Sequence, residues 1–247
     1  MTQQAALSEI ADIGSAQADL DPSTDRYAKR FTGPAGEWML GRQTAALRSF
    51  MPDGPVSVLD VGGGHGQVAR PLLADGHEVT VLASTEQALG QVRDIVDPRL
   101  KTEFGSLTEV PFGDQSFDIV TSFRIMAHIG EWNALLAEMM RVARRAIIID
   151  FPIPGGVNAL EPLLFGLKKK LEGDTRKFAT MTRPDVEAAL RGGGFARTRH
   201  VGQFVLPMVV HRKLKRPGIS AALEKMCGGL APRIGTPVVL CAQRDAE

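Results

Sequence analysis

Cysteine and long apolar runs are both scarce in this chain. Its 247 residues include only Cys227 and Cys241, too few for a disulfide framework and without the spacing of metal ligands. No stretch approaches the roughly 18 apolar residues that span a bilayer, and the N-terminus lacks the basic and apolar regions of a signal peptide. We therefore expect a cytoplasmic protein in a reducing compartment, with contact to a membrane surface left open.

An overall excess of one charge sign is also missing. The 29 Lys and Arg residues nearly balance the 28 Asp and Glu residues, which argues against a dedicated polyanion-binding protein. The charges are nevertheless divided, because residues 1–150 hold 13 basic and 20 acidic side chains whereas residues 151–247 hold 16 and 8. Either the basic half faces an anionic acceptor or membrane, or the two halves attract each other within one domain.

Strand-like and helix-like segments alternate from residue 56 to residue 151. Strands are predicted at 56–61, 78–82, 100–104, 117–122 and 146–151, and helices at 67–75, 86–96 and 131–144. The last helix is the clearest, because Trp132, Leu135 and Met139 recur on one face. Strands that alternate with helices indicate a parallel sheet with helices on both sides.

The flanking segments follow a looser pattern. Residues 1–24 are polar and predict a weakly ordered arm. Further helices are predicted at 37–50, 160–171, from 182, and at 219–226, and further strands at 195–206 and 237–242. The expected organisation is an arm with lid helices over residues 1–50 and a single domain over 51–247, with insertions near 152–182 and 207–232.

A glycine-rich turn follows the first predicted strand and opens the next helix. It reads Asp60-Val61-Gly62-Gly63-Gly64-His65-Gly66. Such glycines permit a tight turn and let a ligand approach bare backbone, while the helix N-terminus offers free N–H groups. The dinucleotide pattern G-x-G-x-x-G requires glycine where Gln67 stands, so a nicotinamide cofactor is disfavoured.

The run Asp60-x-Gly62-x-Gly64-x-Gly66 resembles the first motif of class I S-adenosylmethionine-dependent methyltransferases. Residues 105–120 resemble the family's loop after the third strand and its fourth strand, and residues 141–144 resemble the helix end before the fifth. The resemblance implies an α/β fold with a doubly wound, mostly parallel seven-stranded sheet and an antiparallel last strand. It also implies S-adenosylmethionine as cofactor and S-adenosylhomocysteine as product.

Cofactor contacts are implied by the same resemblance. The glycines would pass under the methionine and ribose, and Asp60 would hold the loop or the methionine ammonium. The full set of cofactor candidates is Asp60, Gly62, Gly63, Gly64, His65, Ala83, Ser84, Ser106, Leu107, Phe123 and Tyr27. Tyr27 belongs either to a lid over the cofactor or to ordinary helix packing.

Two positions depart from the family pattern. Ala83 stands where the family places an acid against the ribose, and Ser106 stands where it places Asp against the adenine amine. A substitute contact with the ribose could come from Ser84, Thr85 or Glu86 after a small register shift. Loss of a charge-assisted hydrogen bond costs about 1–3 kcal/mol, so we expect weaker cofactor binding or a modified cofactor.

Three residues at the predicted carboxyl edge of the sheet are candidates for catalysis. His128 has a pKa range suited to proton abstraction near neutral pH, or it packs in its loop. Asp150 would orient His128 or a substrate hydroxyl, or only cap backbone. Arg124 would bind an anionic substrate group, or pair with a surface acid. Methyl transfer needs alignment more than acid–base help, so a general base is not required.

These features predict methyl transfer to a small or amphiphilic, anionic acceptor, at oxygen or carbon rather than nitrogen. Metal-ligand spacing and an Asn/Asp-Pro-Pro-Tyr/Phe motif are both missing. One alternative is a non-methylating protein that binds S-adenosylmethionine or S-adenosylhomocysteine. Another is a peripheral membrane or RNA-associated protein that uses the basic ends of 163–170 and 204–215. Sequence-specific nucleic acid binding is not expected, and the oligomeric state stays open.

Overall fold

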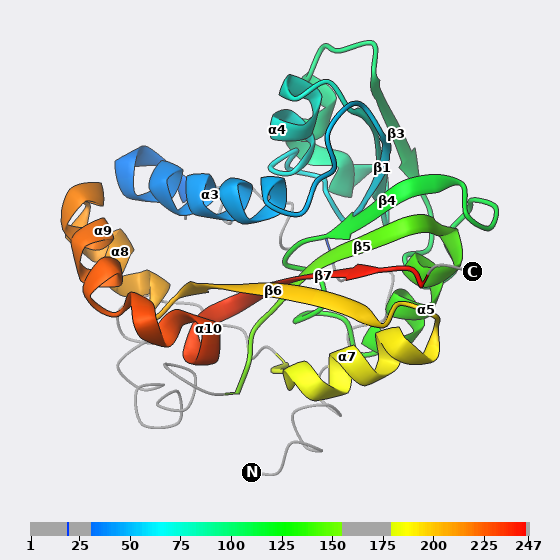
Figure 1. The fold of residues 1–247 in the computed structure, drawn as a ribbon. Coiled ribbons are helices and arrows are strands. Elements are labelled where there is room, and N and C mark those ends of the chain that lie inside the picture. The colour runs from blue at the N-terminus through cyan, green and yellow to red at the C-terminus, as the bar shows by residue number, and fades with distance from the viewer. Residues whose placement is uncertain (1–18, 20–30, 155–178, 246–247) are drawn as a thin grey trace.

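The computed structural model describes residue 19 and residues 31–154 and 179–245, which build a seven-stranded sheet with helices on both faces (Figure 1). The strand order is β3-β2-β1-β4-β5-β7-β6. The first five strands pair in parallel, and β7 lies antiparallel to both of its neighbours. The predicted fold class, including the antiparallel last strand, is confirmed.

The strands are β1 (Ser57–Val61), β2 (Glu78–Ala83), β3 (Leu100–Phe104), β4 (Phe117–Ser122), β5 (Ala143–Phe151), β6 (Arg197–Phe204) and β7 (Thr236–Gln243). The α-helices are α3 (Gly33–Arg48), α4 (Ala69–Ala74), α5 (Trp132–Val142), α7 (Arg183–Gly192), α8 (Met208–Leu214), α9 (Pro217–Met226) and α10 (Ala231–Ile234). Two 3₁₀ helices complete the described elements, η3 (Gln87–Asp94) and η5 (Gly228–Leu230).

Several predicted bounds differ from the structure, and two of these differences have identifiable reasons. The helix predicted to reach Arg144 ends at Val142, because Ala143 is extended with ψ 130° and pairs with Phe117 as the start of β5. The helix predicted at 86–96 is a shorter 3₁₀ helix, because Gly90 breaks it with φ 37° and ψ −128°. Periodicity does not detect such local breaks.

The core has two layers, one on each face of the sheet. One layer packs α5 and α7 against β1, β4, β5 and β7, and the other packs α3, α4 and η3 against the opposite face. A third, smaller cluster joins Phe31, Met39 and Phe204 between α3 and the end of β6. The two main layers hold the strand ends in fixed positions, which is what a binding site at the sheet edge requires.

Several expectations fall on parts of the chain outside the described residues. Tyr27, the predicted helix at 160–171 and most of the arm are among them. The insertion predicted near 207–232 is described and contains α8, α9 and η5. Among the residues described, no helix has the length and apolarity needed to cross a membrane.

Candidate active site

The glycine turn lies between β1 and α4, at the point where the strand order reverses from β1–β2 to β1–β4. Gly62 donates its N–H to the carbonyl oxygen of Leu82 at 2.7 Å. Its φ of +79° favours glycine, and a Cβ there would overlap the side chain of Ile125. Ligands of open α/β sheets bind in this crevice, so the turn is placed as the motif predicts.

Asp60 is the residue before the last in β1, and its carboxylate is buried beside the turn. Its Oδ1 accepts a hydrogen bond from the Thr121 hydroxyl at 3.0 Å, whereas its buried Oδ2 has no described partner. A Cβ on Gly63 would overlap that oxygen. Burial raises the pKa of Asp60 to about 7, although the Thr121 hydrogen bond opposes the shift. A cation brought against the bare backbone would supply the missing partner.

The carboxyl end of β2 receives an acid from a distant part of the chain. Ala83 is buried, and the N–H of the following Ser84 donates to the Asp19 carboxylate at 2.7 Å. The Ser84 hydroxyl donates to the same carboxylate. Asp19 is fully buried, and this burial raises its pKa despite the hydrogen bonds from Ser84. Sequence reasoning missed Asp19, because its position in a polar arm gives no signal.

The end of β3 is arranged differently. The Ser106 hydroxyl accepts hydrogen bonds from the N–H groups of Thr108 at 3.2 Å and Glu109 at 3.0 Å. Leu107 is buried in the core on the α5 side of the sheet. Ser106 therefore shapes its own loop, and a contact of either residue with the cofactor stays a prediction.

Arg124 follows β4 in a left-handed conformation, with φ +64°. Its backbone N–H donates to Asp150 Oδ1 at 2.5 Å, and its Nη2 donates to Gln43 Oε1 at 2.6 Å. The guanidinium lies 3.7 Å from the centre of the Phe31 ring, and its buried Nη1 has no described partner. Burial raises the pKa of Asp150 to about 6, against the opposing charge of Arg124.

The remaining predicted residues lie around this edge. His65 is buried in the glycine turn, and Phe123 is buried in the core on the α3 side. His128 is half-buried in the loop after β4, where its N–H donates to the carbonyl oxygen of Ile125 at 2.8 Å. Asp150 accepts a hydrogen bond from the backbone N–H of Arg124, not from the Phe151-Pro152 turn. Its expected roles toward His128 and a substrate hydroxyl stay predictions. The described residues contain no cluster of three metal-ligating side chains.

Known proteins resemble this chain in both sequence and fold. A family model described as a methyltransferase domain matches residues 58–146. A demethylmenaquinone methyltransferase from Clavibacter sepedonicus is 27% identical over 200 residues, covering 73% of this chain and 82% of that protein. The match to 27-O-demethylrifamycin SV methyltransferase from Amycolatopsis mediterranei (strain S699) is 30% identical over 114 residues, 41% of this chain and 42% of that enzyme.

A solved structure extends the comparison to almost the whole chain. It is a SAM-dependent methyltransferase, possible histamine N-methyltransferase, from Thermotoga maritima, with a TM-score of 0.66 at 14% identity. The match covers 93% of this chain and 99% of that protein, and it shows the fold. The methyltransferase domain at 58–146, the methyltransferase relatives and the shared fold support a class I S-adenosylmethionine-dependent methyltransferase. Its cofactor is S-adenosylmethionine.

The residues of this methyltransferase fit that cofactor at its amino-acid end. The buried Oδ2 of Asp60 suits an ammonium group, because it has no described hydrogen-bond donor. Gly63 has no Cβ, which would overlap this oxygen. Ser84 and Asp19 place a hydroxyl and a carboxylate at the next strand end, where a ribose would need acceptors. The assignment of individual contacts stays a prediction.

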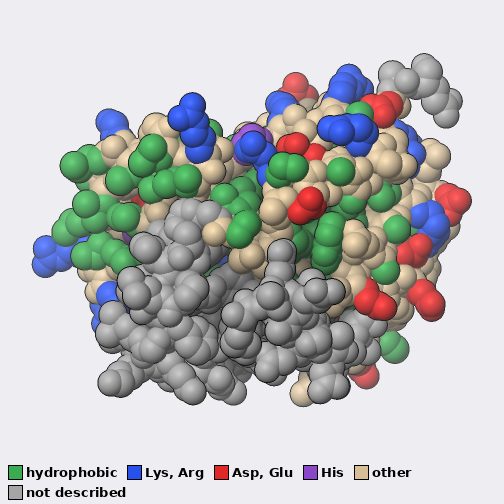
Figure 2. Space-filling model, turned by 90° about the horizontal axis from the view of Figure 1, so that it is seen from below, with side chains coloured by type: hydrophobic (Ala, Val, Ile, Leu, Met, Phe, Trp, Pro, Cys, Tyr) green, Lys and Arg blue, Asp and Glu red, His purple; other side chains and the backbone are tan. Residues whose placement is uncertain are grey.

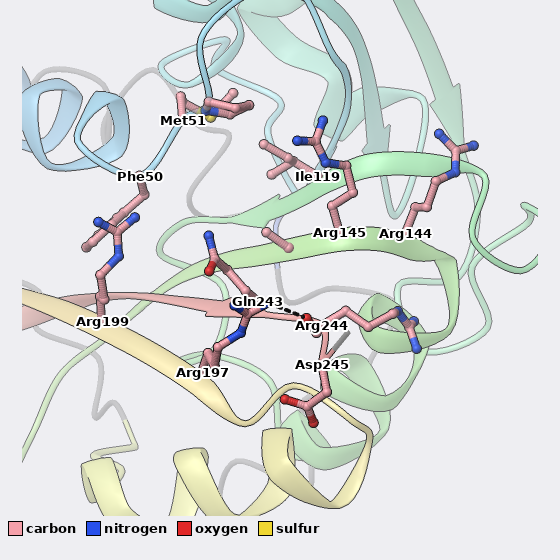
Figure 3. Close-up of a pocket in the computed structure, with 12 residues that line it drawn as sticks. Phe50, Met51, Ile119, Arg144, Arg145, Arg197, Arg199, Gln243, Arg244 and Asp245 are labelled. Carbon is pink, nitrogen blue, oxygen red and sulfur yellow. Dashed lines mark hydrogen bonds between the residues drawn. The ribbon is translucent and has the colours of Figure 1, made fainter. Parts of the chain in front are cut away.

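The methyltransferase also has a basic pocket on the opposite edge of the sheet (Figure 3). It lies where β5 and β6 begin and β7 ends, whereas the glycine turn follows the end of β1. Arg145 and Arg199 contribute to its lining. This pocket is separate from the cofactor edge.

Proposed function

We propose that this methyltransferase methylates an oxygen or carbon atom of a small amphiphilic acceptor that carries an anionic or carbonyl group. The single observation that carries the proposal is the partly buried Arg124 guanidinium at the carboxyl edge, whose buried Nη1 has no described hydrogen-bond partner. A buried cationic donor without a partner is costly unless a ligand satisfies it. The names of two relatives, which refer to demethylmenaquinone and 27-O-demethylrifamycin SV, support a small-molecule acceptor.

A second donor without a described partner supports a methyl acceptor with a polar end. Gln203 lies near the end of β6, and its buried Nε2 has no described partner. Arg42 of α3 donates to the backbone oxygen of Gln203 at 2.6 Å, while its own Nε is also buried and without a described partner. Together these donors favour an acceptor rich in oxygen atoms.

The apolar cluster beside these donors supports an amphiphilic acceptor. Phe31, Met39 and Phe204 form it, with Trp38 and Met208 packed against it. Phe31 also lies under the Arg124 guanidinium. An acceptor with one oxygen-rich end and one apolar end matches this neighbourhood, because each end meets its own kind of surface.

The chemistry requires alignment and, for a hydroxyl acceptor, loss of a proton. S-adenosylmethionine supplies an electrophilic methyl group on its sulfonium. We assign removal of the proton to His128, which lies half-buried in the loop after β4. Asp150 holds the backbone of Arg124 and so positions the guanidinium. His128→Ala is expected to lower turnover without a change in S-adenosylhomocysteine affinity.

The acceptor is supplied, we propose, at an anionic membrane surface. The α8–α10 cap (residues 208–234) contains six Lys and Arg residues and one acid, Glu224, which is buried. On α9 and just beyond it, Ile219, Met226 and Leu230 are exposed, with Met226 83% exposed. Figure 2 shows hydrophobic and basic side chains together at the end of the molecule that carries this cap. Exposed apolar side chains among cations are typical of interfacial helices.

The acceptor is tested with labelled methyl donor and fractionated lipid and metabolite extracts. We expect label in anionic amphiphiles with the wild type, and loss of at least about tenfold in transfer with Arg124→Gln. S-adenosylhomocysteine affinity should not change in this variant, and Arg93→Gln, an exposed arginine paired with Glu86, is the matched control. Label in neutral polar compounds only, or unchanged transfer with Arg124→Gln, would contradict the proposal.

Membrane contact is tested by sedimentation with vesicles. We expect the wild type to sediment with phosphatidylglycerol vesicles at low salt but not with phosphatidylcholine vesicles. Lys213→Gln and Met226→Gln should each weaken sedimentation, the first by charge and the second by apolar contact. Lys101→Gln, an exposed change on β3, should have no effect. Equal sedimentation with both lipids, or with neither, would contradict membrane contact but leave the acceptor proposal intact.

A further inference from the structure

The basic pocket has a volume of about 420 Å³ and lies away from the cofactor edge. Its lining residues are Phe50, Met51, Pro52, Ile119, Arg144, Arg145, Ala146, Arg197, Arg199, Gln243, Arg244 and Asp245. They come from β4 to β7, from the two residues that follow β7 and from the link between α3 and β1, and none of them lies in a helix. Five are arginines and one is acidic.

The pocket stands on one row of the sheet. Ile119 of β4 pairs with Ala146 of β5, Ala146 pairs with Gln243 of β7, and Gln243 pairs with Arg197 of β6. Residues in one row of neighbouring strands point to the same face. The row therefore places two apolar side chains, the Gln243 amide and the Arg197 guanidinium next to one another on one face of the sheet. Arg199 lies two residues further along β6, on the same face.

Two of the five arginines are already engaged inside the protein. Arg144 Nη1 forms an ion pair with Asp118 Oδ1 at 2.8 Å. Arg244 Nη2 donates to the backbone oxygens of Met140 and Ala143, both at 2.8 Å, and its guanidinium lies 4.5 Å from the Phe195 ring centre. Figure 3 shows both side chains directed away from the pocket.

The other three arginines keep their charge uncompensated. Arg145, Arg197 and Arg199 form no ion pair with any carboxylate of the described residues, and all three are exposed. Arg197 donates only to the backbone oxygen of Arg244 at 3.3 Å, and Arg199 lies 5.3 Å from the centre of the Phe50 ring. In Figure 3 the amide of Gln243 points toward the space between Arg199 and Arg145.

We propose that this pocket binds a small phosphate-bearing molecule with a planar or apolar part. Guanidinium groups hold phosphate oxygens through paired N–H donors, and three of them on a fixed sheet suit a group with more than one negative charge. Phe50 and Ile119 form an apolar wall beside them. The volume is that of a small-molecule site. Because the pocket lies at the opposite edge, its ligand is neither the methyl donor nor the acceptor.

The test uses pyrophosphate as the probe, titrated calorimetrically into the 247-residue chain at low salt. We expect saturable one-to-one binding, weakened at least about tenfold by Arg145→Gln and by Arg199→Gln. Arg191→Gln, an exposed arginine on α7, is the control of equal charge change and should bind as the wild type does. Adenosine diphosphate should bind more tightly than pyrophosphate if the apolar wall contributes.

The outcomes separate a site from general attraction to anions. No saturation up to about 10 mM pyrophosphate would overturn the proposal, as would equal weakening by Arg191→Gln. A short RNA that binds at least as tightly per phosphate, with equal losses in all three variants, would show diffuse charge attraction and also overturn it. S-adenosylhomocysteine affinity should be unchanged in every variant, so failure here leaves the methyltransferase site untouched.

Discussion

At the residue scale, we predict that Asp60 makes cofactor binding sensitive to pH, because its buried Oδ2 has no described hydrogen-bond partner. The pKa of Asp60 is raised to about 7 by burial, so below that pH the free enzyme holds the neutral acid. Only the ionised form pairs with the methionine ammonium. The ionised fraction falls from about 0.8 at pH 7.5 to about 0.1 at pH 6, so affinity for S-adenosylhomocysteine should fall about eightfold. Isothermal titration calorimetry with S-adenosylhomocysteine at pH 7.5 and at pH 6 measures this change in affinity.

Asp60→Asn is the control for this prediction. The amide keeps the shape but does not titrate in this range, so binding should be weak and nearly independent of pH. His65 is a second ionisable side chain in the same turn. A pH dependence that persists in Asp60→Asn would assign the effect to His65 and contradict the role given to Asp60.

Asp19 gives a second prediction at this scale. Its carboxylate accepts from the N–H and hydroxyl of Ser84, yet each of its oxygens keeps a further lone pair for a ribose hydroxyl. If it supplies the acid that Ala83 cannot, Asp19→Asn should weaken S-adenosylhomocysteine binding about tenfold. Asp53→Asn, an exposed substitution, should leave it unchanged. Equal affinities in both variants would contradict the predicted contact between Asp19 and the ribose.

The two aspartates mark what the sequence can and cannot predict about a site. Asp60 and the glycines are adjacent in the chain, so their spacing alone places them together. Asp19 and Ser84 are 65 positions apart, and Gln43 reaches Arg124 across 81 positions. Contacts of this kind depend on how the arm and α3 return to the sheet, which no local pattern encodes.

At the scale of elements, a buried acid fastens α9 to the end of β6. Glu224 accepts hydrogen bonds from the N–H groups of Val205 and Leu206 at 2.9 and 3.0 Å, and it lies 2.9 Å from His211 Nε2. Glu224→Ala leaves these buried groups without a partner, so the free energy of unfolding should fall by about 3 kcal/mol. Urea denaturation measures the loss.

Lys225→Ala tests whether that loss comes from the buried network. Lys225 is the next residue on α9 and is exposed, so its removal should change the free energy of unfolding by no more than about 0.5 kcal/mol. A similar loss in both variants would contradict the role given to the buried Glu224 network, because alanine does not lower helix propensity.

The elements also differ in how well periodicity reveals them. The bounds of β3 and β4 were predicted to the residue, because turn signals flank short β-rich runs. The break at Gly90 was not predicted, because a single glycine inside a helical pattern does not always interrupt the helix. The boundary between α5 and β5 was missed because Ala143, Arg144 and Arg145 suit a helix, and their extended form comes from pairing in the sheet.

At the scale of the whole molecule, one sheet connects the cofactor edge to the α8–α10 cap. The cap follows β6, β6 pairs with β7, and β7 pairs with β5 beside the strands that hold the glycine turn. We therefore predict that residues 51–247 unfold as one cooperative unit. The only two tryptophans report on separate regions, because Trp38 packs on Phe204 and His211 near the cap and Trp132 packs on the core under α5.

Single-tryptophan variants separate the two regions. In Trp132→Phe the fluorescence of Trp38 should change at the same urea concentration as the circular dichroism, and the same should hold for Trp132 in Trp38→Phe. S-adenosylhomocysteine at one hundred times its dissociation constant should add about 2.7 kcal/mol to the free energy of unfolding by either signal. If Trp38 changes before the circular dichroism and ignores the ligand, the cap unfolds separately. In that case the cap and the cofactor site are not coupled through the sheet, and the single-domain prediction is wrong.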